Sequence, residues 1–156
     1  MPHSVPTRPS FLPLLRELVR TYQAFERYSA AHVQTLGLTP AQFDVVATLG
    51  NTEGMNPKQL GEKTLITKGT LTGVIDRLQH KQLVERLPDP RDGRAQIVRL
   101  TAEGQTLFEQ VFPAHGVHIS RVFANVPESQ QEQTRVLLAD LRAAFESTLP
   151  HASSQP

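Results

Sequence analysis

The chain has 156 residues, of which 38% are hydrophobic, and it has no cysteine and a net charge of +1 at pH 7. This length suits one domain of ordinary size, and the lack of cysteine excludes disulfides, thiolate metal sites and thiol-based redox sensing. No run approaches the roughly 18 apolar residues of a membrane-spanning helix, so we expect no membrane contact and a cytoplasmic protein. Residues 1–9 and 150–156 are expected to be flexible tails, and the first contains no secretory signal.

The charge is unevenly distributed along the chain. Residues 56–100 carry nine basic and five acidic side chains, a net charge of +4, whereas the rest of the chain carries −3. A basic segment between acidic ends is typical of a nucleic-acid-binding module within a larger scaffold. A solvated charged surface explains the asymmetry equally well when the charge is considered alone.

Capping residues predict three helix starts in the first half of the chain. Ser10 is expected to cap a helix over residues 10–35. Thr39-Pro40 and Asn56-Pro57 each place an N-cap residue before a proline at the first helical position. They predict a second helix after Thr39 and a short third helix over about residues 57–64.

A fourth helix, capped by Thr67, is expected over residues 68–82. Its apolar residues have the spacing of one narrow buried stripe: Leu71, Val74, Ile75 and Leu78. The opposite face carries small or hydrogen-bonding side chains instead of the Glu/Lys mixture of an ordinary solvated helix.

After the fourth helix the apolar period changes from helical to alternating, which predicts strands over residues 83–87 and 95–100. Residues 88–94 contain two prolines, two aspartates and a glycine, and are expected to form a loop. This β-hairpin is the only β structure that we expect.

Two further helices are expected after the hairpin. The first begins at Thr101 and contains Pro113, which is expected to kink or split it. The second covers residues 128–149. The predicted fold class is therefore mainly α with one small β-hairpin.

Two short helices with a tight connection, followed by a basic hairpin, are typical of a winged helix-turn-helix. A helix with a small outer face reaches base edges in the major groove, and its N-terminus favours phosphate oxygens. An arginine on a protruding hairpin enters the narrow, electronegative minor groove. The predicted DNA-binding residues are Thr67, Lys68, Gly69, Thr70, Thr72, Arg77, Arg91, Asp92 and Arg94.

Among these residues, Asp92 is not expected to contact phosphate but to brace the loop or to hold Arg94 in an ion pair. Each signal also has a plain structural explanation when it is taken alone. A threonine-rich helix face is often only surface, and an Asp-Pro-Arg-Asp-Gly segment is often only a turn. Their occurrence together in the basic segment favours DNA recognition.

The hairpin region resembles the wing signature of MarR-type transcriptional regulators. The matching residues are Leu78, Leu83-Val84-Glu85-Arg86, Asp89-Pro90-Arg91-Asp92-Gly93-Arg94, Val98, Leu100-Thr101 and Gly104. Leu38-Thr39, Gln42-Phe43 and Val46 resemble the second helix of the same family. The chain departs from the family pattern at Gly93, where a second basic residue is frequent, and at Gln82, where glycine is frequent and we expect a modest change in the turn.

The resemblance implies a homodimer whose two recognition helices bind an inverted-repeat operator in double-stranded DNA. It divides a single domain, residues 10–149, into a winged-helix lobe over 39–104 and dimerisation helices over 10–35 and 105–149. The end helices also carry more apolar residues than one small lobe buries. The interface candidates are Phe11, Leu14, Leu15, Leu18, Leu138, Leu141 and Phe145.

Regulators of this family commonly respond to small aromatic or phenolic acids, so the resemblance also implies a repressor that such an effector releases, with no cofactor. The candidate pocket residues are Tyr22, Tyr28, His32 and Phe43, with Arg20, or alternatively Arg16 or Arg27, to pair with a carboxylate. Aromatic residues at helical spacing are also ordinary core residues, and His32 is equally suited to an interface.

A zinc-responsive regulator is the alternative, because His115 and His118 are three residues apart on one helix and His32 or Glu26 would complete a site. The chain has no P-loop, glycine-rich dinucleotide turn or clustered carboxylates, so we expect no enzymatic activity. A protein-binding adaptor is a third class, which steeply salt-dependent DNA binding would exclude.

Overall fold

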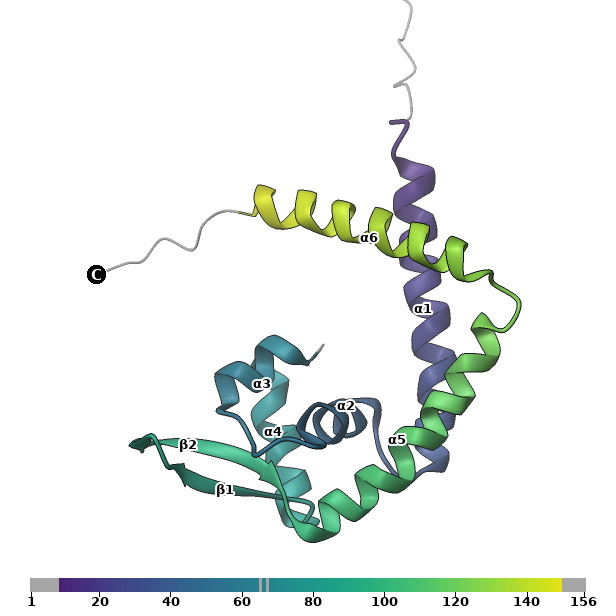
Figure 1. The fold of residues 1–156 in the computed structure, drawn as a ribbon. Helices are drawn as coiled ribbons and strands as arrows, with labels where there is room; N and C mark the ends of the chain where they lie inside the picture. Colours follow the sequence, from purple (N-terminus) through teal and green to yellow (C-terminus); the bar gives the residue numbers. More distant parts are fainter. Residues whose placement is uncertain (1–8, 65, 67, 150–156) are drawn as a thin grey trace, which may run out of the picture. The chain divides into compact units, whose positions relative to one another are not determined.

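The computed structural model describes residues 9–64, 66 and 68–149, which form six helices and one antiparallel pair of strands (Figure 1). The elements are α1 (Leu12–Thr35), α2 (Pro40–Leu49), α3 (Pro57–Lys63), α4 (Lys68–His80), β1 (Val84–Asp89), β2 (Asp92–Leu100), α5 (Ala102–Phe123) and α6 (Glu128–Thr148). The predicted fold class, mainly α with one hairpin, is confirmed. None of the helices in these ranges combines the length and the apolarity needed to cross a membrane.

The chain divides into two compact units, residues 1–116 and 117–156. The first contains α1 to β2 and most of α5, and the second contains the end of α5 and α6. Helix α5 runs through Pro113 as one helix, so of the two predicted effects of this proline, a kink or a split, the split is wrong. The predicted tails lie outside the described residues, except for Pro9.

Side-chain caps explain where α2 and α3 begin. Thr39 accepts a hydrogen bond from the backbone N–H of Gln42 at 3.2 Å, and the Gln42 side chain accepts one from Thr39 N–H at 3.1 Å. Asn56 and Gln59 form the same reciprocal box at 2.9 and 3.1 Å. These boxes satisfy N–H groups that lack intrahelical partners, and they confirm both predicted starts.

Helix α1 begins differently from the prediction. It starts at Leu12, the N-cap position is Phe11, and no side chain caps it. The predicted cap by Ser10 is therefore wrong. At the other end Gly37 has φ +78°, the left-handed conformation that glycine favours after a helix.

The main core lies where α2, α3, α4 and the hairpin meet. The predicted stripe of α4 is buried, with Ile75 2% and Leu78 0% exposed, and Leu49 of α2 and Leu60 of α3 pack in the same cluster. A second, smaller cluster joins the end of α1 to α5 through Val33, Leu38 and Val111. The main core holds the inner face of α4, which leaves the outer face for solvent or a partner.

A turn centred on Gln82 leads from α4 into the hairpin. Helix α4 ends at His80, two residues before the predicted end, and Gln82 has φ +59°. The N–H of Gln82 donates to Gln79 O at 2.9 Å, and the N–H of Leu83 donates to Leu78 O at 3.0 Å. This is a Schellman motif, whose left-handed position usually carries glycine. Gln82 adopts the conformation that glycine favours, so the departure from the family pattern introduces strain at this position.

The hairpin is longer and its connection shorter than predicted. β1 and β2 pair from Val84↔Leu100 to Asp89↔Asp92, so only Pro90-Arg91 forms the turn, and the predicted loop over 88–94 is wrong. A register irregularity between Pro88 and Asp89 accommodates the proline, which cannot donate to a ladder. Figure 1 shows the hairpin extending from the lobe formed by α2, α3 and α4.

Backbone pairing also extends beyond the hairpin. Met55, before α3, forms an isolated bridge with Val98 of β2. The N–H of Met55 donates to Val98 O at 3.0 Å, and the N–H of Val98 donates to Met55 O at 2.8 Å. The hairpin is therefore not the only β structure, and this bridge ties β2 to the segment between α2 and α3.

Candidate DNA-binding site

The outer face of α4 is exposed at the predicted contact residues whose side chains the structure describes. Gly69, Thr70, Thr72 and Arg77 are exposed, whereas the opposite stripe is buried in the core. A Cβ added at Gly69 would meet nothing within 4 Å, so this part of the helix surface is unobstructed. Thr67 lies outside the described residues, and of Lys68 only the helical backbone is described. The structure thus presents a slim helix face of the kind that lies along base edges.

The tip of the hairpin presents the predicted arginines to solvent. Arg91, Asp92 and Arg94 are exposed. The carboxylate of Asp92 accepts a hydrogen bond from the backbone N–H of Arg94 at 3.1 Å, and Asp89 accepts one from the N–H of Arg91 at 2.8 Å. Asp92 therefore braces the turn, as predicted. Among the described residues, the ion pairs do not include the alternative one between Asp92 and Arg94. The two carboxylates thus hold the backbone at the turn, and the side chains of Arg91 and Arg94 are exposed.

Two ion pairs stabilise the hairpin. Arg86 Nη2 lies 2.6 Å from Asp76 Oδ1 of α4, and Arg86 Nη1 donates to the side chain of Gln79. Arg99 Nε lies 2.7 Å from Glu85 Oε1, within the hairpin itself. The contact between Arg86 and α4 was not predicted from the sequence, although Arg86 lies in the wing motif, because the two partners come from different elements.

Several candidate effector residues meet between α1, α2 and α5. His32 Nδ1 lies 3.1 Å from His115 Nδ1, and the two rings stack with centroids 5.3 Å apart. Phe43 packs edge-to-face on His115 at 4.6 Å, and Ser29 Oγ lies 3.2 Å from His115 Nε2. His115 is 8% exposed. The structure thus joins His32 and Phe43 through His115, which the sequence analysis considered only as a metal ligand.

Comparison with known proteins identifies the family. The family model for MarR matches residues 38–95, which run from the start of α2 into β2. Over 138 residues the chain is 32% identical to the multiple antibiotic resistance protein MarR of Escherichia coli, and the match covers 88% of this chain and 89% of that protein. The chain belongs to the MarR family. It is a MarR-type winged helix-turn-helix transcriptional regulator.

Solved structures of MarR-family proteins share the fold. A cysteine-to-serine mutant of E. coli MarR complexed with operator DNA has a TM-score of 0.74 at 28% identity, covering 85% of this chain and 98% of that one. Bordetella bronchiseptica BpsR, whose DNA binding is regulated by 6-hydroxynicotinic acid, has a TM-score of 0.75 at 25% identity, with 86% and 96% covered.

In this MarR-family chain Arg20 and Tyr22 lie on earlier turns of α1 than His32, whereas Tyr28 lies one turn before it on the same face of the helix. Tyr28 is half-buried, whereas Tyr22 is half-exposed, and a side-chain hydrogen bond to Glu26, with smaller effects of burial and of the Glu26 charge, raises the pKa of the Tyr22 phenol. Arg20 is 12 residues from His32, which is about 18 Å along a helix. One chain therefore does not bring Arg20 to the His32 ring.

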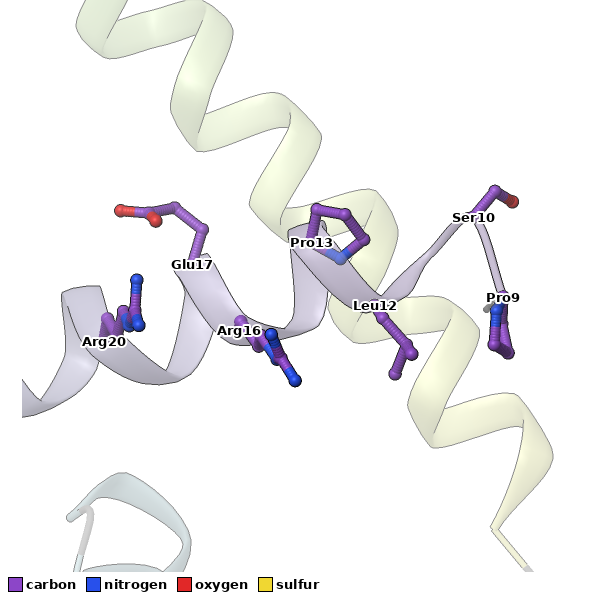
Figure 2. A pocket seen from close by; sticks show the side chains of 7 residues that line it. All are labelled: Pro9, Ser10, Leu12, Pro13, Arg16, Glu17 and Arg20. Carbon is purple, nitrogen blue, oxygen red and sulfur yellow. The ribbon is translucent and has the colours of Figure 1, made fainter. Parts of the chain in front are cut away.

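Arg20 instead lines a shallow hollow on the first turns of α1 (Figure 2). The other lining residues are Pro9, Ser10, Leu12, Pro13, Arg16 and Glu17. All come from one helix and the residues just before it, so this hollow is not the aromatic pocket that the sequence predicts.

The zinc alternative gains no support from this MarR-family structure. Within residues 9–64, 66 and 68–149, no group of three or more His, Cys, Asp or Glu side chains is arranged to hold a metal ion. The ring nitrogens of His115 lie against His32 and Ser29. His115 is thus engaged with α1 by hydrogen bonding.

The predicted dimer interface residues are largely accessible in the single chain. Phe11, Leu14, Leu15, Leu138 and Phe145 are exposed, and Leu18 and Leu141 are half-buried. Large exposed apolar side chains on two helices are unusual for a monomer. A second copy of the chain is suited to bury these apolar side chains.

Proposed function

We propose that this protein is a homodimeric, sequence-specific repressor that binds an inverted-repeat operator in double-stranded DNA and is released by a small aromatic acid. One observation carries the proposal. The inner face of α4 is buried, its outer face is exposed at Gly69, Thr70, Thr72 and Arg77, and an arginine-bearing hairpin protrudes from the same lobe (Figure 1). The complex of the related E. coli MarR with operator DNA supports this use of the fold.

Each predicted DNA-binding residue has a role in this proposal. Thr70 and Thr72 approach base edges in the major groove, together with Gly69, Lys68 and Thr67. Arg77 binds a phosphate. Arg91 and Arg94 enter the minor groove, where a narrow width strengthens the negative potential. Asp92 holds the backbone of Arg94 in place.

The domain division in this proposal follows the sequence prediction. Residues 39–104 form the DNA-binding lobe, and residues 10–35 and 105–149 form the dimer. The exposed apolar residues of α1 and α6 support the dimer. We expect the protein to sediment as a dimer without DNA, and a clean monomer at micromolar concentration would exclude the two-fold arrangement.

The effector in this proposal carries an aromatic ring and a carboxylate, as 6-hydroxynicotinic acid does in the regulation of BpsR. The His32–His115 pair with Phe43 supports this chemistry. Phe43 already packs edge-to-face on an aromatic ring, and a protonated histidine donates to a carboxylate. Tyr28 is the further predicted contact.

Operator binding by point variants tests the DNA face. Arg94→Ala is expected to weaken binding by about 1–3 kcal/mol and to leave the fold intact, and Thr70→Ala is expected to relax base preference. Arg142→Ala on α6 removes the same charge outside the basic segment and is the matched control. Duplexes selected from a random pool by the wild-type protein supply the operator for these measurements.

Two results would contradict the placement of the DNA face. One is wild-type affinity and base preference in both Arg94→Ala and Thr70→Ala. The other is an affinity that does not fall with salt, because phosphate contacts require counterion release.

A further inference from the structure

Arg86 of β1 reaches α4 near the middle of the hairpin by a polar contact, in addition to Val84, which packs in the core with α4. Arg86 binds Asp76 at 2.6 Å through one guanidinium nitrogen and Gln79 through the other. Asp76 and Gln79 are three residues apart on α4, so they lie on the same face of the helix. One planar guanidinium therefore spans about a turn of α4, the recognition helix in the proposed function.

The opposite strand is fixed at the same level of the ladder. Arg86 pairs with Val98 in the strand register, and Val98 is the residue that bridges to Met55. At this rung the hairpin is thus held on one side by backbone hydrogen bonds and on the other by the Arg86 side chain. The backbone bridge acts as an axis, and Arg86 limits rotation about it.

We propose that Arg86, Asp76 and Gln79 are positioning residues that set the angle between the wing and the recognition helix. This inference rests on the proposed DNA-binding function. From Arg86 to the turn at Pro90-Arg91 the strand runs about 15 Å at roughly 3.3 Å per residue. A rotation of about 10° at Arg86 therefore moves the tip by about 2.5 Å. That displacement exceeds the narrow distance range of a hydrogen bond, so Arg94 loses the minor groove while α4 stays in the major groove.

The exposure of the pair argues against a role in global stability. The side chains of Arg86 and Asp76 are 25% and 58% exposed, and ion pairs this accessible contribute little to folding. Asp76 is also an acidic residue directly beside Arg77 in the segment proposed to face DNA. The negative charge of a carboxylate there opposes phosphate binding. The contact of Asp76 with Arg86 explains why an acidic residue stands at this position.

Charge and position predict opposite effects for Asp76→Asn. Removal of the negative charge of Asp76 alone tightens operator binding, whereas loss of its contact with Arg86 weakens operator binding. We expect Asp76→Asn and Arg86→Gln each to weaken operator binding about five- to ten-fold. In hydroxyl-radical footprinting of these variants, protection of the operator DNA is expected to disappear at its flanks, which the hairpin contacts, and to persist at its centre, which α4 contacts. The charge swap Asp76→Arg with Arg86→Asp is expected to restore part of the flank protection.

Arg99→Gln is the matched control, because it breaks an ion pair with Glu85 inside the hairpin and leaves the link to α4 intact. It is expected to change affinity by less than about two-fold. If Asp76→Asn binds more tightly than the wild type, or if Arg99→Gln loses the same flank protection as Arg86→Gln, the positioning role is refuted.

A measurement without DNA separates this inference from the proposed function. Because the chain has no cysteine, Gly93→Cys at the tip and Lys58→Cys on α3 accept spin labels specifically. With labelled protein diluted into unlabelled protein, pulsed electron resonance is expected to show one narrow distance, which broadens in Asp76→Asn and not in Arg99→Gln. An unchanged distribution in Asp76→Asn refutes the inference, whereas failure of the wild type to bind DNA refutes the proposed function alone.

Discussion

Replacement of Gln82 by glycine is expected to stabilise the protein, although it removes a side chain. Gln82 has φ +59°, and a left-handed backbone costs a non-glycine residue about 1–2 kcal/mol. Glycine relieves that strain, but it loses about 0.5–1 kcal/mol through the greater freedom of the unfolded chain. The net gain is therefore about 0.5–1 kcal/mol. For a chain of this length it corresponds to a rise of about 2 °C in Tm.

Thermal unfolding at equal protein concentration measures this difference, because the Tm of a dimer depends on concentration. Gln110→Gly is the matched control. Gln110 is exposed within α5, where the same substitution is expected to cost about 1 kcal/mol. Operator affinity of Gln82→Gly is expected to equal that of the wild type, because the turn already has the shape that glycine favours. A loss of stability equal to that of Gln110→Gly would refute the strain at Gln82.

Three further outcomes are expected. Gly104→Ala is expected to lower the free energy of unfolding by about 3 kcal/mol, because a Cβ at Gly104 would lie 1.9 Å from the Leu83 carbonyl oxygen. Gly116 has open space around the position of a Cβ, so Gly116→Ala is expected to raise the free energy of unfolding by up to about 1 kcal/mol. Urea unfolding compares the two variants, and equal effects would show that the crowding is relieved by a small shift. Leu78→Ala is expected to cost about 3 kcal/mol in the same assay, because Leu78 is completely buried, and a cost below about 1 kcal/mol would mean that the core collapses around the cavity. Added zinc or chelator is expected to leave operator affinity unchanged by fluorescence anisotropy, and a zinc-dependent change would revive the metal-sensing alternative.

Local sequence rules account for the parts of the fold that were predicted well. The starts of α2 and α3 follow from Thr39 and Asn56, whose capping partners lie only three residues away. The buried stripe of α4 follows from helical periodicity alone, since every residue in it lies on one face. These features depend on neighbours within one element, so the sequence specifies them directly.

The features that were missed depend on contacts between elements. Pro88 was expected in a loop, but an irregular pair at the strand end accommodates it and lets β1 continue to Asp89. The bridge between Met55 and Val98 and the pairing of Arg86 with Asp76 join different elements. No local pattern marks such partners, which only the folded chain brings together.

The same distinction applies to the functional residues. The exposed face of α4 could be predicted because a helix with one apolar stripe has a polar opposite side. The neighbours of His115 could not, because His32 lies 83 residues away in sequence. Residue spacing on a single helix instead suggested His118 as its partner, which led to the zinc alternative.

The small cluster of Val33, Leu38 and Val111 has a consequence for allosteric response. Three buried side chains hold the end of α1 to α5, whereas twelve form the core of the DNA-binding lobe. Regions with few buried apolar contacts open at a lower free energy than the global unfolding of a protein. The joint between these helices is therefore expected to open at a lower free energy than the core of the lobe, and under the proposed effector response a molecule inserted there would shift the helices while the lobe keeps its shape. In that response, occupancy of the joint would alter DNA affinity without unfolding the DNA-binding lobe.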